Sequence, residues 1–159
     1  MTEKISVNVN GEAHHLDRAL GPVNALVVLR EELGLRRTRY GCGSGSCGAC
    51  TIIVDGQART SCDIPLEALH GCQLETAECL GTPDRPHPIV QCLIKHQAAQ
   101  CAYCMSGIAM RIKSLLQAEQ PADEAGLLQA LDQHLCRCGA HSRILRAARE
   151  LLADSKGAL

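Results

Sequence analysis

Eight of the eleven cysteines fall into two groups whose spacing suits metal ligation. The first group contains Cys42, Cys47, Cys50 and Cys62, which follow the pattern C-x4-C-x2-C with a fourth cysteine after eleven intervening residues. The first three cysteines have a spacing typical of ligands to a 2Fe–2S cluster, which needs four thiolates. We therefore predict that this group holds one 2Fe–2S cluster.

The loop around the first group is rich in glycine, with Gly41, Gly43, Gly45 and Gly48 beside the cysteines. A loop that wraps a small inorganic core needs backbone with positive φ or close approach to sulfur, and glycine permits both. Its amides can also donate hydrogen bonds to the cluster. The alternative is a zinc site, but zinc favours two short cysteine knuckles and this loop offers only one.

The second group joins Cys101 and Cys104 to Cys136 and Cys138, with thirty-one residues between the two pairs. The first pair alone would also fit half of a zinc site or a redox pair. However, the C-x-C unit is unusual for a structural zinc knuckle. Both pairs adjoin ends of predicted helices, and a helix N-terminus favours an anionic group. We therefore predict a second 2Fe–2S cluster here.

The remaining cysteines, Cys72, Cys79 and Cys92, are assigned no metal, and Cys92 is expected to be a small buried apolar side chain in a helix. The seven histidines are expected to be surface or capping groups. The sequence contains no Ser–His–Asp spacing and no phosphate-binding Gly-Lys motif. We therefore assign no catalytic residue to this chain.

The chain of 159 residues has a formal charge of −1, so no basic surplus favours nucleic acid. We expect no secretory signal and no membrane span, and hence a cytoplasmic protein. Thiols stay reduced in that compartment, which favours metal chemistry over disulfides. The chain has two tyrosines and no phenylalanine or tryptophan, so the clusters are expected to help stabilise the fold.

Hydrophobic patterning predicts an α+β first half and an all-helical second half. In the first half we expect strand hairpins over 5–16 and 51–60, separated by a helix over 23–33. The proline-rich segment 81–88 is interpreted as a linker, which predicts domains at 1–80 and 81–159. Helices are then expected at 89–97, 104–118, 124–134 and 142–153, with Ser142 as the N-cap of the last.

These motifs together resemble a known family, the iron–sulfur small subunits of the xanthine dehydrogenase and aldehyde oxidase group of molybdenum hydroxylases. The resemblance runs from about Ile5 to about Leu152. The segment from Cys138 to Arg146 resembles small subunits of nicotinate and isoquinoline hydroxylases. The matching motifs are Tyr40 to Cys50, Ser61-Cys62, Gln100 to Cys104 with Gly107, and Leu135 to Gly139 with Arg143-Ile144.

The resemblance implies a ferredoxin-like β-grasp domain, carrying a plant-type 2Fe–2S cluster, followed by a small helical bundle with the second cluster. It implies that electrons pass singly from a molybdopterin cytosine dinucleotide in a large partner subunit to a flavoprotein subunit or a cytochrome c. The reaction served would be water-dependent hydroxylation of an N-heteroaromatic or aldehyde substrate. In the family the residues at Gln100 and Cys138 lie beside the pterin, although Gln100 also fits an ordinary polar helix cap.

The sequence departs from the family pattern at Ala102 and Cys79, where glycine is usual, and at Ser106, where proline is usual. These positions affect loop geometry rather than ligands. One rival function is a free-standing ferredoxin-type electron carrier, which would not need the second cysteine group. Another is a zinc-stabilised interaction module. Two arginine sets are interpreted as a solvated face or as a docking surface for an acidic partner: Arg36, Arg37 and Arg39, and Arg143, Arg146 and Arg149.

Overall fold

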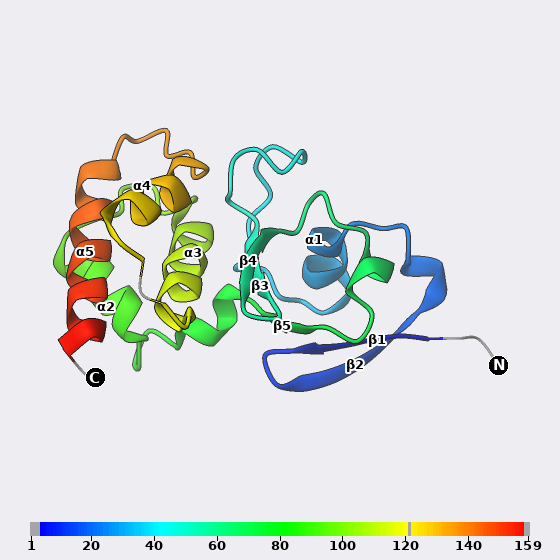
Figure 1. Ribbon diagram of the computed structural model, residues 1–159. Helices are drawn as coiled ribbons and strands as arrows, with labels where there is room; N and C mark the ends of the chain where they lie inside the picture. The colour runs from blue at the N-terminus through cyan, green and yellow to red at the C-terminus, as the bar shows by residue number, and fades with distance from the viewer. Residues whose placement is uncertain (1–3, 121, 158–159) are drawn as a thin grey trace.

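The computed structural model describes residues 4–120 and 122–157, which form a sheet half and a helical half side by side (Figure 1). The strands are β1 (Lys4–Val9), β2 (Glu12–Asp17), β3 (Thr51–Val54), β4 (Gln57–Thr60) and β5 (Gln73–Glu75). The sheet half also has the helical segments η1 (Arg18–Leu20), α1 (Ala25–Val27), η2 (Val28–Glu32), η3 (Leu66–Leu69) and η4 (Ala77–Leu80). The helical half contains α2 (Pro88–Lys95), α3 (Met105–Gln117), α4 (Glu124–Asp132) and α5 (His141–Gly157).

The five strands form one sheet in the order β2-β1-β5-β3-β4. Both predicted hairpins are confirmed, and their turns have positive φ at Asn10 and Asp55, each followed by a glycine. The central strand β5 pairs parallel to β1 and antiparallel to β3. This strand was not predicted from the sequence, and it joins the two hairpins into a ferredoxin-like β-grasp sheet.

One face of the sheet carries the first core. Ile5, Val7 and Val9 alternate inward along β1 and pack with Leu29 of η2. The predicted helix over 23–33 begins at Ala25 and continues through Glu32 as a π-helical turn, so its last part is wider than an α-helix.

The helical half contains the four predicted helices with shifted ends. The predicted N-cap at Ser142 is wrong, because α5 already begins at His141. The segment 81–88, predicted as a linker, is an ordered turn in which Thr82 and Arg85 exchange two backbone hydrogen bonds, and Pro88 is the first residue of α2. Among the described residues, no helix combines the length and apolarity that crossing a membrane requires.

The two halves are in close contact through α3 and β3. Gly107 of α3 lies against the Gly48 carbonyl, where an added Cβ would sit 2.0 Å from the oxygen. His134 fills the adjoining space with 2% of its surface exposed, and its Nε2 lies 3.2 Å from the Thr51 hydroxyl. The prediction that all histidines are surface or capping groups is therefore wrong for His134, which is buried between the halves.

Candidate metal centres

The first cysteine group is assembled by the β3–β4 hairpin and the loop that precedes it. Cys50 ends this loop and Cys62 follows β4, so the open end of the hairpin brings the two together. The Ser61 hydroxyl fixes this junction by donating to the Cys50 carbonyl at 2.8 Å. Both cysteines are buried against Leu26, whereas Cys42 is exposed.

The backbone of this loop is arranged around sulfur, as the sequence predicts. Gly43, Gly45 and Gly48 have positive φ, and a Cβ on Gly41 would lie 2.5 Å from the Cys47 sulfur. Three backbone amides donate to thiols of the group: those of Ser44 and Ser46 to Cys42 at 3.4 and 3.2 Å, and that of Gly45 to Cys62 at 3.2 Å.

The electrostatic surroundings differ between the two sides of this group. The amide of Ser44 lowers the pKa of Cys42 to about 6. Burial raises the pKa of Cys62, and the neighbouring Cys50 adds to the effect. The exposed Cys42 and the buried Cys62 therefore lie on opposite sides of the group. The backbone amides that donate to their sulfurs suit an anionic iron–sulfur core.

The second group is formed where two segments of the helical half meet. Cys104 is the N-cap of α3, and Cys136 and Cys138 lie in the turn before α5. Gln100 joins the segments, because its Nε2 donates to the Cys138 carbonyl at 3.2 Å. Cys101 neighbours Cys138, and Cys104 neighbours Cys136, so the four thiols form two pairs.

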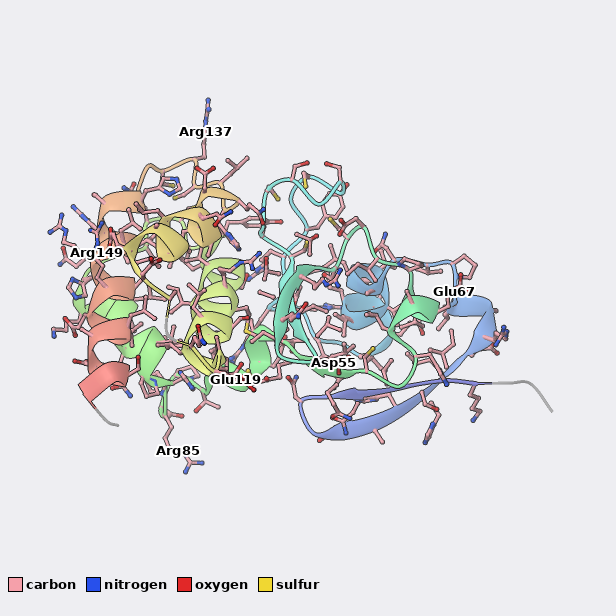
Figure 2. All side chains as sticks on the ribbon, viewed as in Figure 1. Asp55, Glu67, Arg85, Glu119, Arg137 and Arg149 are labelled. Atoms are coloured by element: carbon pink, nitrogen blue, oxygen red, sulfur yellow. The ribbon has the colours of Figure 1, made fainter. Side chains whose placement is uncertain are left out.

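Burial also divides this second group. Burial raises the pKa of Cys104, the innermost of the four thiols. Cys101 is exposed, and the amide of Tyr103 lowers its pKa. Arg137, between the two cysteines of the C-x-C unit, points away from the ribbon into solvent (Figure 2).

Neither cysteine group is as compact as a single metal ion requires. Four thiolates around one zinc ion at 2.3 Å would place their sulfurs roughly 3.8 Å apart. Within residues 4–120 and 122–157, the one trio of His, Cys, Asp or Glu ligand atoms that all lie within 4.8 Å of one another belongs to neither group. The four thiols of each group would hold a two-iron core in this wider arrangement better than a single zinc ion.

The two groups lie at the same end of the molecule, in the loops drawn in cyan and orange at the top of Figure 1. A backbone hydrogen bond of 3.1 Å connects them, from the amide of Leu135 to the carbonyl of Cys47. Leu135 is bonded in the chain to Cys136, so the ligand loops are joined by one hydrogen bond and a few covalent bonds. His134 beside this contact is neutral at pH 7, because burial lowers its pKa to about 4.

Other positions singled out in the sequence are the remaining cysteines, Ala102 and the two sets of arginines. Cys92 is buried in α2, as expected, and Cys72 is half-buried. Ala102 has a φ of 61°, the left-handed region that glycine adopts without penalty. Several arginines have partners within the chain: Arg37 donates to the Gly81 carbonyl, and Arg143 donates to the Gln97 carbonyl. Arg149 of α5, labelled in Figure 2, pairs with Glu124 of α4.

Comparison with known proteins identifies both halves as iron–sulfur domains. Residues 7–80 match the family model of the 2Fe-2S iron-sulfur cluster binding domain, and residues 76–149 match that of the [2Fe-2S] binding domain. One subunit of nicotinate dehydrogenase from Pseudomonas putida is 46% identical over 94% of this chain and 94% of its own length. The alpha subunit of isoquinoline 1-oxidoreductase from Brevundimonas diminuta is 38% identical over 89% of this chain and 95% of its own.

Solved structures of two oxidoreductases share the fold of this chain. One chain of quinoline 2-oxidoreductase from Pseudomonas putida superposes with a TM-score of 0.85 at 26% identity, covering 98% of this chain and 96% of that one. Aldehyde oxidoreductase from Desulfovibrio desulfuricans superposes with a TM-score of 0.88 at 32% identity, covering 98% of this chain and 17% of that longer chain.

The chain belongs to the two-cluster iron–sulfur subunits of the molybdenum hydroxylases. It is the electron-transfer component of an oxidoreductase whose substrate chemistry takes place on a partner chain. The free-standing ferredoxin and the zinc-stabilised module are the less favoured alternatives, since the relatives are subunits of dehydrogenase and oxidoreductase complexes.

Proposed function

We propose that Cys42, Cys47, Cys50 and Cys62 bind one 2Fe–2S cluster, that Cys101, Cys104, Cys136 and Cys138 bind another, and that electrons enter at the second group and leave from the first. The observation that carries this proposal is the gathering of the eight thiols into two groups that the Leu135–Cys47 hydrogen bond links. When bound, each cluster accepts and releases one electron at a time.

The residues of the chain hold and tune these centres. Amides of the first loop donate to sulfur, which stabilises negative charge and raises the reduction potential. Burial of Cys62 and Cys104 keeps water from one side of each group, so exposure and hydrogen bonding tune the two potentials separately. The division into domains 1–80 and 81–159 is part of the proposal, with one cluster in each.

Exposed apolar side chains beside the second group support docking of the large partner there. Tyr103 lies within the Cys101–Cys104 loop and is 49% exposed, and Leu135 precedes Cys136 and is 63% exposed. We propose that Gln100 and Cys138 on this face lie against the molybdopterin of the partner. An exposed apolar surface of this kind is typical of a protein contact.

A groove next to this face extends the proposed contact. Arg39 at its rim also lies over the Tyr103 ring, 5.7 Å from the centroid. An apolar floor with a cationic rim fits a partner segment that carries acidic residues around an apolar centre. The groove is lined in part by Leu80, Leu93, Ile94 and Met105, with Arg37, Arg39 and Arg143 among its polar members.

The finer assignments rest on similarity to the nicotinate and isoquinoline enzymes. We propose an N-heteroaromatic substrate, molybdopterin cytosine dinucleotide in the partner, a flavoprotein subunit or a cytochrome c as acceptor, and a cytoplasmic location. Native mass spectrometry of the purified complex identifies the partner and the nucleotide. Turnover assays with nicotinate, isoquinoline and an aromatic aldehyde then separate the substrate classes, and a complex active only on the aldehyde contradicts the substrate proposal.

Ligand assignment is tested by counting iron and spins. The anaerobic protein should contain about four iron and four sulfide per chain and give two 2Fe–2S signals by EPR after reduction. Cys47→Ser and Cys138→Ser should each remove or alter a different signal, whereas the control Cys72→Ser should change neither. A single signal with about two iron at full occupancy contradicts the assignment.

The order of the centres is tested by rapid mixing of the complex with substrate. In Cys47→Ser, substrate should still reduce the second centre while turnover with the external acceptor collapses. In Cys138→Ser, the first centre should stay oxidised on the turnover timescale. The reverse pattern means that the order is wrong.

A further inference from the structure

A cluster of three potential metal ligands lies away from both cysteine groups, between α2 and α5. Cys92 and His96 are four residues apart on and just after α2, so their side chains lie on the same side of the helix. Glu150 of α5 reaches them from the facing helix. Their ligand atoms all lie within 4.8 Å of one another, and no other such trio occurs in residues 4–120 and 122–157.

The distances suit a single small ion. Nε2 of His96 is 2.9 Å from Oε2 of Glu150, and Sγ of Cys92 is 3.6 Å from Oε1. With bonds of about 2.3 Å to sulfur and about 2.0–2.1 Å to nitrogen and oxygen, tetrahedral zinc places neighbouring ligand atoms roughly 3.3–3.6 Å apart. One ligand atom from each residue lies within 4.8 Å of the other two, so side-chain shifts of about 1 Å or less would bring the three to the spacing that zinc requires.

We propose that Cys92, His96 and Glu150 bind one zinc ion and that this ion clamps α2 to α5. A thiolate, an imidazole and a carboxylate together favour zinc over magnesium or calcium, which prefer oxygen ligands only. Binding releases the thiol proton, after which one thiolate and one carboxylate balance the charge of the ion. Water would fill the fourth position of the ion, because the side chains of His96 and Glu150 are 22% and 31% exposed.

The surroundings of Glu150 fit a ligand carboxylate. Lys95 Nζ lies 2.7 Å from Oε1, so Oε2 can bind the ion while Lys95 orients the carboxylate through its other oxygen. Without metal, an ion pair among Lys95, His96 and Glu150 would hold the helices together, and the Cys92 thiol would only donate a weak hydrogen bond, so the zinc titration separates the two arrangements. The Cys92 sulfur nevertheless faces the carboxylate, and its other polar partner is the Ala147 carbonyl at 3.4 Å.

The zinc ion would stabilise the second cysteine group through α2 and α5, which lead to the segments that carry it. The segment after α2 leads to Cys101, and α5 begins just after Cys138. Fixing α2 against α5 therefore fixes the distance between the two segments that carry this group. Zinc bound here would stabilise the second centre without touching any of its thiols.

The experiment uses the holoprotein with both clusters, freed of loosely bound metal and then titrated with zinc. Zinc and iron are counted by mass spectrometry, and the zinc ligands are identified by zinc K-edge X-ray absorption, which iron does not obscure. We expect about one zinc per chain, with one sulfur at about 2.3 Å and nitrogen or oxygen at about 2.0–2.1 Å. The Tm of the holoprotein should rise on zinc addition.

Variants decide between this site and the alternatives. Cys92→Ala and Glu150→Gln should each weaken zinc binding more than about 100-fold, since even outer-shell losses cost about 10–100-fold. The control Cys72→Ala should bind zinc like the wild type, and iron content should stay unchanged in all three. If Cys92→Ala fails to fold, Glu150→Gln decides alone. Wild-type protein without tight zinc, an unchanged affinity in a ligand variant, or a shell of four sulfurs each overturns the proposal.

Discussion

Gly107→Ala should destabilise the holoprotein and move the two cysteine groups apart. A Cβ added at Gly107 would lie 2.0 Å from the Gly48 carbonyl oxygen, and no side chain can rotate to relieve a clash with backbone. To restore an ordinary contact of 3.4 Å, α3 would have to move about 1.4 Å from the loop that carries Cys47 and Cys50.

The cost follows from overpacking. Such substitutions cost about 1–3 kcal/mol, and a backbone obstacle places this one near the upper limit. The higher helix propensity of alanine offsets about 0.5–1 kcal/mol of this cost, so the free energy of unfolding falls by about 2 kcal/mol in total. For a protein of this size that loss lowers Tm by about 4–8 °C.

Gly126→Ala is the matched control, because Gly126 and Gly107 are both the third residue of their helices. At Gly126 the added Cβ would meet only the Asp123 carboxylate at 3.2 Å and the Ala122 Cβ at 3.6 Å. Tm is measured on anaerobic holoprotein by circular dichroism and by visible cluster absorption, and spin coupling between the reduced clusters reports their separation. A Gly107→Ala protein that melts with the wild type and keeps its coupling would refute the reasoning.

Removing iron with a chelator under reducing conditions should lower the Tm substantially, because a core with few aromatic side chains depends on its metal centres for stability. The Tm is measured by circular dichroism, and an apo-protein with the Tm of the holoprotein contradicts this prediction. Thr51→Val should cost about 1–3 kcal/mol in denaturant unfolding, because the Gly48 carbonyl and His134 lose their shared hydroxyl. Thr60→Val is its control and should cost less, because it loses a single exposed hydrogen bond, from the Thr60 hydroxyl to Asp63. Ala102→Gly should stabilise by about 0.5–1 kcal/mol in the same assay, by relieving left-handed strain, and a loss contradicts that account.

Local sequence signals were sufficient for the features that local chemistry determines. Asn10-Gly11 and Asp55-Gly56 predicted both hairpins, because each dipeptide adopts the positive φ values that such turns require. The glycines beside the first cysteine group predicted a loop wrapped around sulfur, and the loop has that backbone.

Features that depend on distant contacts were not predictable in this way. Strand β5 has three residues with one buried side chain, Leu74, so it has no detectable period, and it is a strand only because β1 and β3 flank it. His134 is buried by Gly48 and Thr51, which lie far away in the chain. The cluster of Cys92, His96 and Glu150 likewise needs α5 folded against α2.

The central position of β5 determines the order in which the chain can fold. Within each outer hairpin the two strands pair with each other over a short stretch of chain, so this pairing can form as soon as the residues of the hairpin are available. The sheet, however, lacks its middle strand until Gln73–Glu75 are in place between strands separated by more than forty residues. During synthesis, the first cysteine loop therefore emerges complete while the sheet beneath it is still open. Pairing of β5 with β1 and β3 is therefore the slow, non-local step, and the first cysteine loop gains its support from the sheet only after that step.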